Sequence, residues 1–126
     1  MRALTGALLL AMLGGCNEPR PTLTGGKSAG HWVEQLRANP DAKVRKEAAF
    51  KLGNVGPADP SALPALTAAL KDRDAAVRGE AVLALVKFGA AARPVVPALS
   101  DVRDHDRDPK VRGYAAKAVE KLRAGE

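Results

Sequence analysis

The densest group of potentially reactive side chains lies between Asp101 and Asp108, where four carboxylates flank His105. Asp104, Asp106 and Asp108 alternate like the first ligands of an EF-hand calcium loop. The sixth position of that loop is a proline instead of the required glycine, and the twelfth is an alanine instead of a bidentate glutamate. We therefore expect a solvated loop with a capping aspartate and no metal site, with a bound cation as the alternative.

Other catalytic arrangements lack essential parts. His31 and His105 are far apart in the sequence and give no zinc pair, and no Gly-x-Ser-x-Gly motif supports a nucleophilic serine. The run Gly25 to Ser28 resembles the end of a phosphate-binding loop but lacks the upstream glycine and the preceding strand. We expect no catalytic residue, no cofactor and no enzymatic activity.

The single cysteine follows an apolar segment at the N-terminus. Met1-Arg2 is positively charged, residues 3–13 are apolar, and Gly14-Gly15 precede Cys16, which is the layout of a secretory signal peptide. The apolar run is shorter than the roughly 20 residues that span a membrane. The alternative is an apolar helix that buries an inert cysteine.

The ending Leu13-Gly14-Gly15-Cys16 resembles the bacterial lipobox. This resemblance implies that Cys16 is diacylated through its sulfur and becomes the new N-terminus of an exported protein. Two acyl chains would anchor the protein stably, and Asn17 at the next position favours the outer membrane. We expect a signal peptide over residues 1–15 and a flexible, lipidated tether over residues 16–30, which is rich in proline and glycine.

The composition of the chain fits one small domain. It has 126 residues, of which 46% are hydrophobic and 3% aromatic, and a formal net charge of +6. One cysteine excludes a disulfide scaffold. The mild positive charge favours acidic partners without naming one.

The remainder of the chain is a repeat. The pattern Asp-x-x-Val-Arg occurs at 41–45, 74–78 and 108–112, with spacings of 33 and then 34 residues. In the middle unit, the apolar residues after this motif follow the spacing of one helical face. They are Val77, Ala81, Ala84, Leu85 and Phe88.

The ends of these helices carry recognisable signals. Asp74 and Asp108 stand where an N-cap is expected, and Gly56 and Gly89 stand where a helix ends in a left-handed residue. A shorter apolar helix precedes each motif, and no segment has a strong strand pattern. The sequence therefore predicts an all-α fold, a short α-solenoid of about three antiparallel helix pairs over units 31–56, 60–89 and 94–123 of a domain spanning 31–126.

The units resemble the short HEAT-like repeat of the phycobilisome-lyase type. That pattern runs apolar-Pro-x-Leu, Asp, Val-Arg, Ala-Ala, Leu and Gly, and residues 63–89 follow it almost position for position. The first and third units depart from it as terminal capping units do. The lyase name alone suggests an accessory subunit of an enzyme, but no catalytic motif accompanies it.

The recurring aspartates and arginines have a structural interpretation. Each Asp lies four residues before its Arg on one helix, where an ion pair contributes about 0.2–0.5 kcal/mol. The HEAT-like resemblance implies that such residues hydrogen-bond between neighbouring repeats. We interpret them as structural ladders: Asp41, Arg45, Asp74, Arg78, Asp108 and Arg112.

One face of the second helices is the candidate binding surface. In HEAT-like arrays these helices line the concave side, and at 100° per residue the side opposite the apolar stripe is basic with apolar interruptions. Asn54 and Gly79 share this side. The predicted partner-binding residues are Lys43, Lys46, Phe50, Leu83, Lys87, Lys110, Tyr114, Lys117 and Lys121.

The repeat, the basic helix face and the N-terminal segment together support three functional hypotheses. The first is a membrane-anchored, non-catalytic interaction or scaffold module that binds an acidic protein, with self-association through the ends of the array as a further expectation. The second is a binder of an anionic polymer, a lipid headgroup or nucleic acid. Export and the scarcity of aromatic residues for base stacking disfavour nucleic acid. The third, an accessory subunit of a lyase-type enzyme, has the least support.

Overall fold

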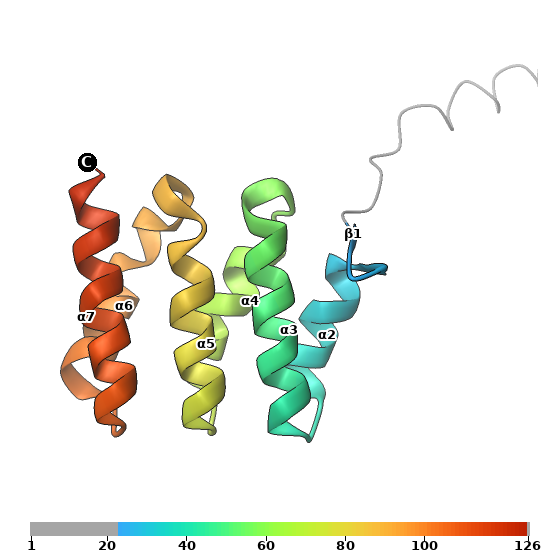
Figure 1. The fold of residues 1–126 in the computed structure, drawn as a ribbon, viewed down its shortest axis with the longest axis horizontal. Coiled ribbons are helices and arrows are strands. Elements are labelled where there is room, and N and C mark those ends of the chain that lie inside the picture. Colours follow the sequence, from blue (N-terminus) through green and yellow to red (C-terminus); the bar gives the residue numbers. More distant parts are fainter. Residues whose placement is uncertain (1–22, 126) are drawn as a thin grey trace, which may run out of the picture.

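The computed structural model describes residues 23–125, which form three antiparallel helix pairs stacked side by side (Figure 1). The first helices of the pairs are α2 (Ala29–Ala38), α4 (Ala62–Ala69) and α6 (Val96–His105). The second helices are α3 (Ala42–Val55), α5 (Ala75–Val86) and α7 (Pro109–Ala124). Two 3-10 helices, η2 (Gly56–Ala58) and η3 (Gly89–Val95), join successive pairs. The predicted all-α solenoid is confirmed; the predicted signal peptide and Cys16 lie outside the described residues.

The second helices begin at aspartate N-caps. Asp41, Asp74 and Asp108 each accept a hydrogen bond from the backbone N–H two residues ahead, at 2.9, 2.8 and 2.8 Å. These bonds satisfy first-turn donors that have no partner inside the helix. After α3 and α5, Gly56 and Gly89 have φ values of 62° and 55°, which turn the chain toward the next pair as predicted.

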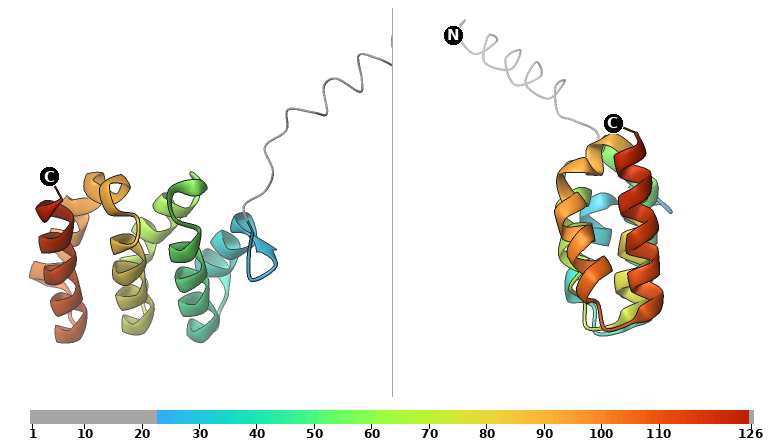
Figure 2. Two further views of the ribbon diagram at one scale, coloured as in Figure 1. Left: turned by 45° about the horizontal axis from the view of Figure 1, so that its top comes forward. Right: turned by 90° about the vertical axis from the view of Figure 1, so that its left-hand side faces the viewer.

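The second helices form one layer and the first helices another, as the view along the stack shows (Figure 2). Within the second layer, α5 contacts both α3 and α7 directly. Gly53 permits the close approach of α3 to α5, because a Cβ at this position would lie 2.8 Å from the Cβ of Ala84. In the first layer, grooves of about 500 and 860 Å³ separate α2 from α4 and α4 from α6.

The core lies between the two layers and repeats with the units. Leu66 and Leu99 occupy equivalent positions in α4 and α6, while Leu52 and Leu85 do so in α3 and α5, and all four are completely buried. Each buried leucine side chain contributes roughly 1.5–3 kcal/mol relative to an exposed one. No pair could bury these side chains alone, so the stacking of neighbouring pairs creates the core.

The predicted tether over residues 16–30 is wrong over its last part. Leu23–Thr24 (β1) and Lys27–Ser28 (β2) form an antiparallel hairpin, and α2 begins directly after it, at Ala29. The hairpin turns at Gly25 and Gly26, whose φ values are 59° and 75°, and a two-residue loop with positive φ at both positions matches the twist of paired strands. Trp32 fixes the hairpin to the array by donating from Nε1 to the carbonyl of Thr24 at 2.9 Å.

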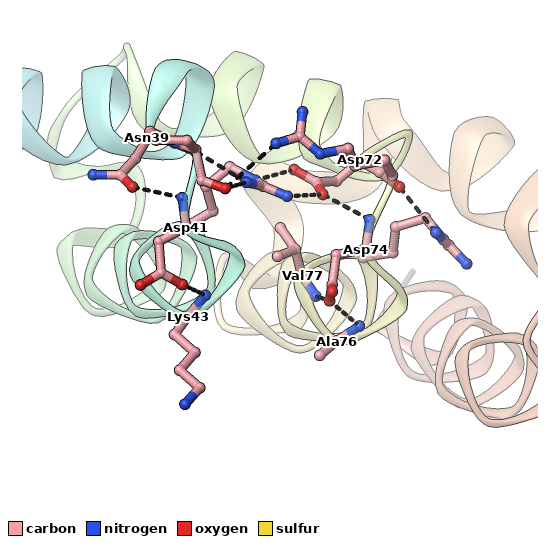
Figure 3. A network of polar contacts seen from close by, with 11 residues as sticks. Asn39, Asp41, Lys43, Asp72, Asp74, Ala76 and Val77 are labelled. Carbon is pink, nitrogen blue, oxygen red and sulfur yellow. Dashed lines mark hydrogen bonds and ion pairs between the residues drawn. The ribbon is translucent and has the colours of Figure 1, made fainter.

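Two of the three ladder arginines, Arg45 and Arg78, each bind a carboxylate of the following repeat; Figure 3 shows the contact at Asp72. Arg45 donates from Nε and Nη2 to the two oxygens of Asp72 at 2.9 and 3.0 Å. Arg78 makes the same bidentate contact with Asp106, at 2.8 and 3.0 Å. Both guanidinium groups are buried, and both accepting aspartates also bind the backbone N–H of the next N-cap residue.

The expected ion pair between each ladder arginine and the aspartate four residues earlier is therefore wrong. The hydrogen bonds between neighbouring repeats that the resemblance implied are present at Arg45 and Arg78. Asp41, Asp74 and Asp108 direct their side chains to the first turns of their own helices. The acceptors are Asp72 and Asp106, two residues before the N-caps, because the long arginine side chain reaches past its own helix to the loop of the next repeat. In the last repeat, Arg112 binds the backbone carbonyls of Asp106 and Arg107.

Removing one acceptor of the ladder should destabilise the whole array. Asp72→Ala leaves the guanidinium of Arg45 buried without its carboxylate, and we expect the free energy of unfolding to fall by about 3 kcal/mol. Urea denaturation measures this loss. Asp101→Ala removes an exposed pair with His105 and should change stability by less than about 1 kcal/mol. Equal losses in the two variants would contradict the structural role of the ladder.

The ladder also predicts sensitivity to acid. Burial alone would raise the pKa of Asp72 and of Asp106, but hydrogen bonds from Arg45 and Arg78 and from backbone N–H groups outweigh it, so both pKa values lie below their ordinary value. A carboxyl group whose pKa is lowered by folding stabilises the native state above its unfolded pKa of about 4 and loses that contribution as the pH falls through its folded pKa. The urea midpoint should therefore decrease below about pH 4. The variant Asp72→Asn/Asp106→Asn should be less stable at neutral pH and should show a smaller decrease; an equal decrease would assign the acid sensitivity to other groups.

Candidate binding surface

The repeat register aligns the exposed residues of the second helices in rows across α3, α5 and α7. Residues 33 or 34 positions apart occupy equivalent places, so that Asn54, Lys87 and Lys121 form one row. All of the predicted lysines are exposed. We call the surface formed by these lysines and the apolar residues between them the lysine face: Lys43, Lys46, Phe50, Leu83, Lys87, Lys110, Tyr114, Lys117 and Lys121.

Two large apolar side chains lie exposed in the middle of the lysine face. Phe50 on α3 is 45% exposed and Leu83 on α5 is 42% exposed, and the register places them at equivalent positions of neighbouring helices. Lys117 occupies the same position on α7. Exposed apolar residues that lie side by side and are surrounded by polar groups are typical of interaction sites.

Lys87 connects the apolar and polar parts of this surface. Its Nζ lies 4.5 Å from the centre of the Phe50 ring and donates a hydrogen bond to Oδ1 of Asn54 at 3.0 Å. Both partners belong to α3, so the side chain bridges two repeats. A cation over an exposed aromatic ring contributes about 0.5–1 kcal/mol, and it keeps the ammonium group beside the apolar pair.

A hollow of about 410 Å³ lies on the same side of the molecule, between α5 and α7. Lys46 and Lys110 contribute to its walls, and Tyr114 lines it together with Gly79. Tyr114 is half-buried, because its ring packs against Gly79, where a Cβ would lie 3.4 Å from two ring carbons. The predicted aromatic residue therefore forms part of a concave wall instead of protruding from the surface.

The structure adds an acidic row that the helical projection did not include. Glu47 on α3 and Glu80 on α5 occupy the positions equivalent to Tyr114 on α7, and Glu80 lines the hollow. The 33-residue register contained this signal, because it places both glutamates between rows of the lysine face. The surface is therefore predominantly basic, and its acidic row limits which arrangements of partner charges fit.

The acidic loop that resembles an EF-hand holds its carboxylates apart. Asp104 pairs with Arg103 at 2.8 Å and His105 with Asp101 at 3.0 Å, while Asp106 belongs to the ladder and Asp108 caps α7. Within residues 23–125, no three histidine, cysteine or acidic side chains form a group that could hold a metal ion.

The other two residues considered for chemistry, His31 and Ser28, take part in local structural contacts. His31 lies in the first turn of α2, edge-on to Trp32, with ring centres 4.9 Å apart. Ser28, in the run that resembles a phosphate-binding loop, accepts a hydrogen bond from the backbone N–H of His31 and caps α2. Among the described helices, none is sufficiently long and apolar to cross a membrane.

Comparison with known proteins identifies the repeat. A family model described as HEAT repeats matches residues 30–120 of the chain. No curated protein matches the sequence. The matched segment covers most of all three helix pairs, the whole ladder and the lysine face except Lys121.

Proposed function

Because the chain belongs to the family of HEAT repeat proteins, we propose that it is a non-catalytic interaction module that binds an acidic protein through the lysine face. We further propose that a lipid on Cys16 anchors this module to the outer membrane of a bacterium. HEAT repeats generally mediate contacts between proteins, which fits a scaffold role.

The observation that carries the proposal is the exposed pair of Phe50 and Leu83 within a group of lysines. Leaving such side chains in water forfeits apolar burial that the fold could otherwise gain, and a partner that covers them recovers roughly 25 cal/mol per Å² of buried apolar area. Aromatic anchors surrounded by polar groups often supply most of the binding energy of an interface. The pair would therefore provide affinity, and the lysines would orient the partner.

The charge of the surface favours an acidic partner. Six lysines lie on the lysine face, against the two glutamates of its acidic row. Complementary charge increases the rate of association and selects partners more than it increases affinity. Carboxylates of the partner fit near Lys46 and Lys110 beside the hollow, and near Lys87 and Lys117 beside the apolar pair.

The folded hairpin shortens the proposed tether. If Cys16 carries the lipid, residues 16–22 connect it to the described part of the chain, which starts at Leu23. Seven residues reach at most about 25 Å when fully extended. The module would therefore act close to the membrane surface, where it can bind other envelope proteins.

Reversing two charges of the lysine face should weaken partner capture. We expect Lys87→Glu/Lys117→Glu to reduce the amount of co-purified partner at least about tenfold, because it replaces attraction with repulsion beside the apolar pair. Capture from envelope fractions of the native host, quantified by mass spectrometry, measures this reduction. The far-UV circular dichroism spectrum should stay unchanged.

The matched control is Lys71→Glu/Arg107→Glu, which changes the net charge equally at exposed positions away from the lysine face. This variant should capture the partner normally. If the control loses as much partner as Lys87→Glu/Lys117→Glu does, net charge explains the binding; if neither variant loses partner, the lysine face is not the binding surface.

The anchor is tested by the mass of the protein from membrane and soluble fractions. We expect a membrane-bound species that begins at Cys16 and carries added acyl mass, since two acyl chains hold a protein stably on a bilayer. Cys16→Ser should remove the lipid and abolish processing at this site. An unmodified, full-length protein in the soluble fraction would contradict the anchor. It would not contradict binding through the lysine face, which does not depend on the lipid.

The alternative ligand is an anionic polymer or lipid headgroup, which the six lysines would also attract. Binding to such a polyanion depends steeply on salt, because each neutralised phosphate releases counterions. It would also be insensitive to the loss of Phe50 and Leu83. A shallow salt dependence together with a large effect of Phe50→Ser would favour the protein partner.

A further inference from the structure

We propose that the outer side of α7 is a second docking surface, which binds a further helix pair of the same kind from outside the described residues. We call this surface the α7 edge; it comprises Arg112, Gly113 and Ala116. The ladder and the core extend up to this edge, and the lysine face does not include it. The proposal therefore stands independently of the function proposed for the lysine face.

Arg112 is held in the same orientation as the other two ladder arginines. In every repeat the ladder arginine donates from Nη1 to the backbone carbonyl oxygen six residues earlier, at 2.9, 2.9 and 2.7 Å. This bond fixes one edge of the planar guanidinium group on its own repeat. The opposite edge, formed by Nε and Nη2, consequently faces the position of the following repeat.

In the first two repeats that opposite edge binds an aspartate of the next repeat through two parallel hydrogen bonds. In the part of the chain that the structure describes, Nε and Nη2 of Arg112 have no such partner. Two parallel donors on a guanidinium group match the two oxygens of a carboxylate. Arg112 is thus a preorganised carboxylate receptor whose ligand must come from outside residues 23–125.

Gly113 is a second, independent feature that α7 shares with α5. It follows Arg112 as Gly79 follows Arg78, and at Gly79 the missing side chain accommodates the ring of Tyr114 from the next repeat. A Cβ at Gly113 would meet nothing within 4 Å. The α7 edge therefore repeats the arginine and the glycine that α5 contributes to its contact with the third pair.

The two ends of the array differ, and the first helix pair of a second copy lacks both groups that the α7 edge requires. The ladder position of the first repeat holds Asn39 instead of aspartate, and the position equivalent to Tyr114 holds Glu47. The hairpin joined to Trp32 also lies at that end. A second copy would offer Arg112 an amide and would offer Gly113 a carboxylate, so it provides neither of the two required groups.

The partner can be described by its chemistry. It carries an aspartate two residues before a helix N-cap, as Asp106 precedes Asp108, and an aromatic residue eight positions after that aspartate, as Tyr114 follows Asp106. Contact would concentrate near the loops, because Glu120 on α7 replaces the partly buried Val86 of α5 and makes the far half of the edge polar. The structure thus assigns the edge to an acidic-loop helix pair.

A chain extended by one repeat tests the receptor directly. In it, a second copy of residues 89–125 follows Leu122, which occupies the register position of Phe88, so that the added aspartate faces Arg112. We expect this chain to unfold about 5 °C or more above the same chain with Asp106→Asn in the added copy, because hydrogen bonds to charged groups are the stronger ones. Arg112→Gln should remove the difference. Equal melting temperatures for the aspartate and asparagine copies would overturn the proposal.

The full chain in its native host tests whether another protein uses the edge. A photo-reactive benzoylphenylalanine in place of Ala116 should crosslink to a helix-pair segment with the acidic-loop pattern, and Arg112→Gln should reduce the product at least about fivefold. The same probe at Ala76 on α5 reports on the lysine-face side and separates the failure of one proposal from that of the other. No product at Ala116, a product with a second copy, or a product insensitive to Arg112→Gln would each overturn the docking proposal.

Discussion

The bidentate contact between a ladder arginine and the aspartate of the next repeat determines how the helix pairs stack. Both groups are buried, and taking charges out of water costs as much as, or more than, their attraction returns. The contact therefore contributes little net stability compared with a well-packed apolar pair. Its effect is on register, because any other stacking would leave Arg45 or Arg78 buried without a carboxylate, at a cost of several kcal/mol.

The candidate binding surface is a consequence of that register. Once the loops are aligned, positions 33 or 34 residues apart lie in rows, and Phe50 comes to lie beside Leu83 although the sequence separates them by a whole repeat. Gly53 completes the arrangement by allowing α3 to approach α5 closely. Lys87 can then reach both the ring of Phe50 and the amide of Asn54. A shift of one turn between the two helices would disperse these contacts.

The sequence predicted the helices well because their signals are local. The apolar spacing, the capping Asp74 and Asp108 and the positive-φ glycines act within a few residues, and all of them have the predicted roles. The acceptors of the ladder were missed for a different reason. Asp72 and Asp106 accept from the arginine of the preceding repeat, whereas Asp74 and Asp108 cap their own helices. The sequence spacing does not show which aspartate of each loop faces the neighbouring repeat. The hairpin was also missed, since its strands have two residues each and depend on Trp32, a contact between segments.

Stability and the proposed binding depend largely on different side chains in this fold. The buried ladder contacts join the first turns of α3 and α5 to the loops of the following repeats. The leucine core lies between the layers, and the lysine face consists of exposed or half-buried side chains of the second helices. Six like charges on one surface repel each other and lower the stability of a small domain, and the exposed Phe50 and Leu83 contribute little to the core. Apart from the contacts of Lys87 with α3 and of Tyr114 with Gly79, the side chains of this surface add little to the packing of the helices. Its composition is understandable if a partner neutralises the charge and buries the apolar pair, so that the energy forgone in folding is recovered in binding.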